Sequence, residues 1–133
     1  MNSKPNYWLL GTTTTFIIPI LYSYKKQYRL LSYSTALALI GSLNYWKNPA
    51  ILYNRTIDCI TGRLSLLSYI YCGFFYIYPF YPSMIGYFNL SMIYRFYDLS
   101  CKTYEKNDST WIKYHILFHL YTTFSKLYVI YWI

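Results

Sequence analysis

The sequence predicts an all-α fold, a polytopic transmembrane bundle of about five helices that forms a single domain over residues 1–133. Of the 133 residues, 56% are hydrophobic and 24% are aromatic, whereas only 12% are charged. The apolar residues lie in long blocks separated by short polar connectors. Blocks of roughly 17–25 such residues are what a hydrocarbon layer about 30 Å thick requires. The composition therefore indicates an integral membrane protein and argues against a water-soluble domain.

The first two helices are predicted over residues 6–24 and 30–45. Pro19 interrupts the first helix, and a membrane helix tolerates such a proline with a kink. A cluster of basic residues at 25–29 ends this helix. The second helix stops before Pro49, because proline disfavours helical geometry in the residue that precedes it.

Three further helices are predicted over residues 57–78, 83–98 and 111–133. The Pro-Phe-Tyr-Pro sequence at 79–82 predicts a tight turn between the third and fourth helices. Residues 100–110 carry several charges and few apolar side chains, so they are expected to form a soluble connector. No internal repeat accompanies this order of helices.

Basic residues predict the orientation of the bundle. The net charge of +8 comes from Lys and Arg near the ends of the apolar blocks, so topology explains it better than a nucleic-acid partner does. The expected partners are membrane lipids and other membrane proteins. The bias favours a cytoplasmic N-terminus and an outside C-terminus, with three basic residues outside and eight on the cytoplasmic side: Lys4, Lys47, Arg55, Arg63, Arg95, Lys102, Lys106 and Lys113.

Two histidines, His115 and His119, stand four residues apart at the head of the last predicted helix. On a helix this spacing puts their Cβ atoms roughly 5–6 Å apart, so both imidazoles can reach one metal ion. A helical wheel places Thr122 and Lys126 on the same face. Because ionisable groups in a membrane span point into the bundle, this polar stripe is expected to face the other helices.

Asp58 is an acidic residue near the start of the third predicted helix, where a carboxylate needs a cation, a metal-bound water or an aqueous opening. Arg55 or Arg63 could equally be its partner. The second helix ends on the side where the third and fifth begin, so Ser42, Asp58 and the two histidines are expected in one leaflet. They could form one site. The alternative is that the histidines bond to other helices without a metal.

Together, Ser42-x-x-x-Trp46, Asp58 and His115-x-x-x-His119 resemble the membrane hydrolase superfamily that includes alkaline ceramidases and the progestin and adipoQ receptors. The resemblance spans about residues 41–126. It implies a seven-helix bundle in which one histidine on the second helix and two on the last bind zinc, and zinc-activated water hydrolyses a lipid amide. His115 and His119 would then be zinc ligands, Asp58 would hold the metal-bound water, and Ser42 would support the site or polarise the substrate carbonyl.

This chain departs from the superfamily at Trp46, which replaces the second-helix histidine and cannot ligate zinc. Asp58 is then the candidate third ligand, because two histidines and one carboxylate support hydrolysis elsewhere. Two helices are also missing. We therefore expect a reduced relative of zinc-dependent lipid hydrolases. The alternatives are a non-catalytic membrane subunit or lipid-binding protein and, third, a proton or ion path lined by His115, His119 and Lys126.

Overall fold

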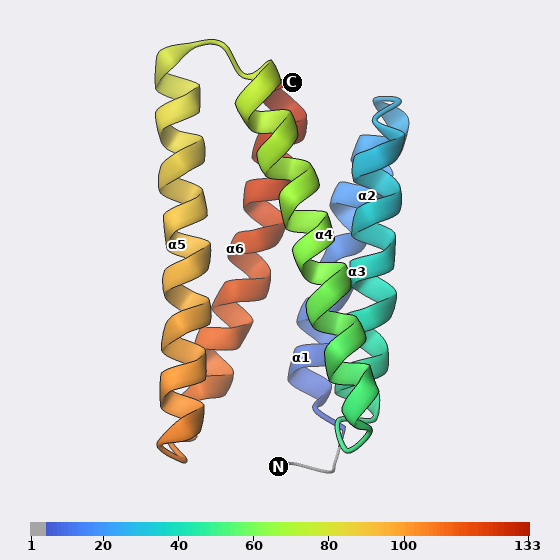
Figure 1. Cartoon of the computed structure of the whole chain (residues 1–133), viewed down its shortest axis with the longest axis vertical. Coiled ribbons are helices and arrows are strands. Elements are labelled where there is room, and N and C mark those ends of the chain that lie inside the picture. Colours follow the sequence, from blue (N-terminus) through green and yellow to red (C-terminus); the bar gives the residue numbers. More distant parts are fainter. Residues whose placement is uncertain (1–4) are drawn as a thin grey trace.

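The computed structural model describes residues 5–133, which form an all-α bundle of five helical rods (Figure 1). The first rod is built from three consecutive segments: α1 (Tyr7–Thr13), the 3₁₀ segment η1 (Thr14–Phe16) and α2 (Ile17–Lys25). The other four rods are α3 (Arg29–Lys47), α4 (Leu52–Tyr76), α5 (Phe80–Glu105) and α6 (Trp111–Trp132). The predicted fold class and helix number are thus confirmed, and these residues contain no strand.

None of the helices within residues 5–133 combines the length and the mean hydropathy needed to cross a membrane. The transmembrane placement of the bundle, and the orientation inferred from its basic residues, therefore stay predictions. Lys4, which was counted toward that orientation, lies outside the described residues.

Pro19 explains the break in the first rod. Proline has no N–H, and its ring crowds the carbonyl group four residues earlier, here that of Thr15. The backbone tightens into the 3₁₀ segment η1 around this carbonyl. The Thr15 hydroxyl also donates to the Thr12 carbonyl at 2.6 Å, which satisfies an acceptor inside the irregular turn. The predicted irregularity is therefore present, but it lies one turn before the proline.

Three predicted helix ends are wrong, and the two errors at helix starts lie near prolines. Helix α4 begins at Leu52, whereas the third helix was predicted to begin at residue 57. Helix α5 begins at Phe80 and extends to Glu105, so most of the expected soluble connector at 100–110 is helical. Pro82 lies within the first turn of α5, where the missing N–H costs no intrahelical hydrogen bond.

The packing of the rods brings chain segments that are far apart in sequence to one end of the bundle. Helix α3 packs against α4 on one side and against α1 and α2 on the other, while α5 pairs with α6 and scarcely touches α4. In Figure 1 the start of α1, the α3–α4 turn and the α5–α6 turn all lie at the lower end. The predicted grouping of the ends of the second, third and fifth helices is therefore confirmed.

Helices α3 and α4 approach each other closely at Gly41. A Cβ atom at this position would lie 2.5 Å from Thr61 Oγ1 and 3.3 Å from Asp58 Cα. Glycine is therefore needed here for the close approach, as at many helix contacts that rely on small residues. This crossing holds Asp58 against α3.

The distribution of side chains is the reverse of that in a water-soluble bundle. Within residues 5–133, fourteen polar or charged side chains are buried, compared with ten hydrophobic ones, and 36 large hydrophobic side chains are exposed. Soluble cores consist mostly of Leu, Ile, Val and Phe. Here the centre of the bundle is filled largely by hydroxyl groups, and the exterior is aliphatic and aromatic.

Replacing Gly41 with alanine should lower the free energy of unfolding by about 1–3 kcal/mol, because the new Cβ would collide with Thr61 and with the backbone of α4. Thermal or denaturant unfolding of the purified chain in detergent measures this change. Gly62→Ala is the matched control, since nothing lies within 4 Å of a Cβ at Gly62. The control should be neutral or stabilising by up to about 1 kcal/mol. Equal effects of the two substitutions would contradict the close crossing.

Candidate functional site

Ser42 and Asp58, two of the predicted site residues, form a hydrogen bond between α3 and α4. The Ser42 hydroxyl donates to the carboxylate of Asp58. Ser42 is buried and Asp58 is half-buried. Within the described residues, neither Arg55 nor Arg63 forms a salt bridge with this carboxylate. The polar partner of Asp58 is therefore a neighbouring hydroxyl group, not an arginine.

His115 contacts α5 and α3 from its position in the second turn of α6. Its Nδ1 atom lies 3.0 Å from Ser100 Oγ on α5, at hydrogen-bonding distance. The centroid of its ring is 5.1 Å from that of Trp46 and 4.8 Å from that of His119. Trp46, which replaces the histidine expected from the resemblance, therefore packs directly against one of the predicted metal ligands.

His119 links α6 to α1. Its Nδ1 atom lies 3.0 Å from Thr12 Oγ1 and 3.3 Å from Thr13 Oγ1. The Thr13 hydroxyl also donates to the Leu9 carbonyl at 2.6 Å. The side chain is 2% exposed and holds two helices together.

The three predicted zinc ligands, His115, His119 and Asp58, do not form a ready-made metal site. Within residues 5–133, no group of three His, Cys, Asp or Glu side chains is placed to hold a metal ion. The Nδ1 atom of each imidazole instead meets a hydroxyl group of a different helix. The residues present do not fit the three-ligand arrangement of catalytic zinc.

A cavity of about 280 Å³ lies between the α3–α4 pair and the α5–α6 pair, at the end of the bundle that holds the start of α1. We name it the Asp58 cavity. Asp58 and His115 both line it. Ser42 and His119 do not line it, although Ser42 is hydrogen-bonded to Asp58. Other lining residues were not predicted as parts of a site: Tyr45, Arg55, Tyr97, Ser100, Tyr104, Glu105 and Trp111.

Charge and aromatic surface are mixed in the Asp58 cavity. The carboxylates of Asp58 and Glu105 and the guanidinium of Arg55 all line it. Trp46 is 6% exposed, and its indole N–H has no hydrogen-bond partner among the described residues. A buried donor without an acceptor is costly to the folded state, so Trp46 is held at this position by its ring contacts and not by a hydrogen bond.

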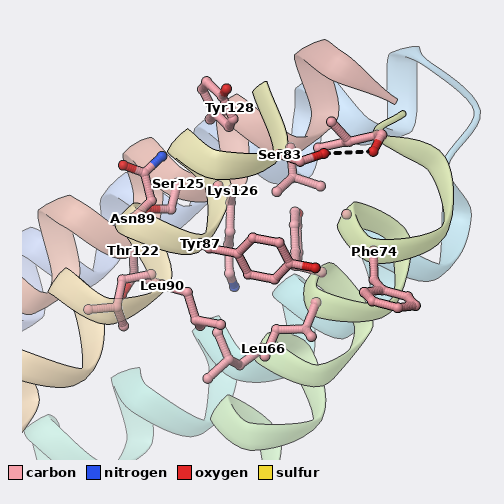
Figure 2. A pocket seen from close by; sticks show the side chains of 17 residues that line it. Leu66, Phe74, Ser83, Tyr87, Asn89, Leu90, Thr122, Ser125, Lys126 and Tyr128 are labelled. Carbon is pink, nitrogen blue, oxygen red and sulfur yellow. Dashed lines mark hydrogen bonds between the residues drawn. The ribbon is translucent and has the colours of Figure 1, made fainter. Parts of the chain in front are cut away.

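A second, smaller cavity of about 90 Å³ lies between α4, α5 and α6, and Lys126 lines it (Figure 2). Lys126 is 4% exposed, and its Nζ atom donates to Ser65 Oγ at 2.7 Å. The same atom lies 4.8 Å from the ring centroid of Phe16 and 5.1 Å from that of Tyr69. The expected inward position of the α6 stripe is confirmed at His119 and Lys126, and a hydroxyl group and two aromatic rings surround the amine.

Two further polar groups around this second cavity lack partners. Asn89 of α5 and Ser125 of α6 both line it (Figure 2). The Asn89 Nδ2 and Ser125 Oγ atoms make no hydrogen bond within the described residues. The cavity therefore offers polar groups beside apolar side chains such as Leu66 and Phe74.

Comparisons of the chain with models of protein families, with curated proteins and with solved structures give no match. The resemblance to the ceramidase and adipoQ-receptor superfamily therefore stays a prediction from five positions of the sequence. The function proposed below rests on the geometry of the chain itself.

Proposed function

We propose that the chain is a small integral membrane protein that binds lipid through its polar cavities and does not hydrolyse it. One observation carries the proposal, namely the outward position of the large apolar side chains and the inward position of the hydroxyl groups. In a bilayer, lipid tails contact the apolar exterior, and the polar groups must satisfy one another inside the bundle. In water, the same exterior would expose an unusually large apolar surface.

The positions of the charged residues support the same placement. Helix α3 has no charged residue between Arg29 and Lys47, and the stretch from α4 to α5 has none between Arg63 and Arg95. Lys126, which lies deep within α6, is turned into the bundle. A charge that faces lipid at the bilayer centre costs at least about 2.5 kcal/mol, so charge-free central segments are favoured in a membrane.

Lipid binding is favoured over hydrolysis because the candidate catalytic groups already have structural partners. Asp58 accepts from Ser42, and the Nδ1 atom of His119 lies at hydrogen-bonding distance from two threonine hydroxyls of α1. The linings of the Asp58 cavity and of the smaller cavity beside Lys126 remain open to a ligand.

Lysine substitutions at two depths of α3 test the membrane placement. Leu37 and Leu30 are 54% and 60% exposed, so neither change disturbs the interior. In a bilayer, Leu37→Lys near the middle of α3 should reduce stability by about 2.5–3.5 kcal/mol, whereas Leu30→Lys at the helix end should cost much less. Unfolding in lipid bilayers, together with the fraction retained in membranes after alkaline extraction, measures both effects. In a water-soluble bundle both changes would stay within about 0.5 kcal/mol, and that result would contradict the proposal.

Zinc-dependent hydrolysis of a lipid amide is the second candidate function. The favouring observation is that Asp58 and His115 line the same cavity, with Ser42 bonded to Asp58. If this candidate is right, the purified chain carries about one zinc ion, and a His115→Gln, His119→Gln double variant loses it. Absence of zinc from the wild-type chain, or zinc that is unchanged in the double variant, would exclude this candidate and leave the lipid-binding proposal intact.

A further inference from the structure

The Asp58 cavity has an aromatic wall. Tyr45, Trp46, Trp111 and Tyr104 follow one another around it, with ring centroids 4.4, 6.2 and 5.2 Å apart between successive members. Tyr97 adds a fifth ring. Aromatic residues near the end of a membrane bundle commonly form a belt that faces the lipid headgroups. These rings line a cavity that is open to one side. Tyr97 and Tyr104 are partly exposed, but Trp46 is almost completely buried, so a belt does not explain its position.

Aromatic faces combined with carboxylates favour a bulky organic cation. Asp58 and Glu105 supply negative charge in the same cavity as the rings. A quaternary ammonium group has no N–H to donate, and cation–π attraction to Trp and Tyr faces is the usual way in which proteins bind it. A compact metal ion instead needs several ligand atoms that converge, and the described residues provide no such group of three.

The cavity also offers a group that suits an anion close to that cation. Arg55 lines it, and a guanidinium binds phosphate well. A volume of about 280 Å³ lies just below the range for drug-sized ligands, which fits a headgroup better than a whole lipid.

We propose that the Asp58 cavity binds a phosphocholine group, with the quaternary ammonium against the aromatic wall and the carboxylates and with the phosphate toward Arg55. If the ligand is a phosphocholine lipid, the proposal rests on the membrane placement proposed above. Binding of the phosphocholine group itself does not depend on that placement, because soluble phosphocholine carries the same two charges. Trp46 then contributes a ring to the site, at the position where the resemblance expects a metal ligand.

The test uses the purified full chain in dodecyl maltoside, which carries neither charge nor choline. One arm titrates soluble phosphocholine and phosphoethanolamine and monitors tryptophan fluorescence. The other arm offers phosphatidylcholine, phosphatidylethanolamine and phosphatidylglycerol and measures retention of each lipid by native mass spectrometry. The choline compound should bind at least about fivefold more tightly than its ethanolamine counterpart, because a primary ammonium is more strongly hydrated and makes weaker use of the rings.

Substitutions of residues that line the cavity distinguish binding at this site from nonspecific contact with lipid. Asp58→Asn and Trp111→Ala should each weaken choline binding about fivefold or more, and Trp46→Phe, which keeps a ring but removes the N–H, should weaken it less. Two controls match them: Trp8→Ala, at a 74% exposed tryptophan near the same end, and Asp98→Asn, at a carboxylate paired with Lys102 on α5. Circular dichroism establishes that each variant keeps its helices.

Three outcomes are informative. Binding of both soluble and lipid phosphocholine supports a lipid headgroup site, and binding of the soluble form alone supports the site chemistry with a soluble ligand. Equal affinity for choline and ethanolamine compounds, or equal losses in the cavity variants and the controls, would overturn the proposal. Because the soluble arm does not depend on a bilayer, its failure is distinguishable from failure of the membrane placement, which the α3 lysine variants test.

Discussion

The bundle depends on hydrogen bonds between its helices, since few apolar side chains lie inside it. Thr35 Oγ1 and Tyr69 Oη, 3.0 Å apart, link α3 to α4, and Thr15 Oγ1 and Thr123 Oγ1, 2.8 Å apart, link η1 to α6. Individual bonds of this kind in membrane bundles contribute about 0.6 kcal/mol on average, so many are needed. The hydroxyl residues are also small, and close helix packing and hydrogen bonding are therefore achieved by the same side chains.

This constraint accounts for the state of the candidate site. An ionisable side chain inside such a bundle must find a polar partner, and His119, Asp58 and Lys126 each find one on another helix. These bonds use one oxygen of Asp58, the Nδ1 atom of His119 and the amine of Lys126. Other polar and charged side chains, such as Arg55 and Glu105, line the Asp58 cavity. We therefore propose ligand binding at this cavity.

The sequence predicted those features that follow from block length and topology. The number of helices and the shared end of Ser42, Asp58 and His115 are set by where apolar blocks start and stop, and the inward face of α6 follows from the helical spacing of its polar residues. Contacts between particular helices were not predictable in this way. Neither Thr12 of α1 nor Ser100 of α5 carries a signal that it will bond to a histidine, because those pairings depend on which rods pack together in three dimensions.

The end of α5 was predicted wrongly for a related reason. Residues 100–105 contain charged and polar side chains that are compatible with a soluble connector, yet they continue α5 as helix. Tertiary packing of this last part of α5 against the start of α6 overrides the local preference. As a consequence Ser100 and Glu105, both on the wall of the Asp58 cavity, could not be recognised as site residues from the sequence.

The most direct test of the reversed distribution of side chains is photolabelling with a carbene reagent that partitions into the bilayer, followed by residue-level mass spectrometry of the reconstituted chain. Outward-facing central residues such as Leu37, Leu67 and Phe88 should be labelled strongly. Buried residues at a similar depth, such as Ser65 and Thr122, should remain unlabelled. Label confined to the helix ends, or equal on the two sets, would contradict a bundle that turns its apolar side chains to lipid and its hydroxyl groups inward.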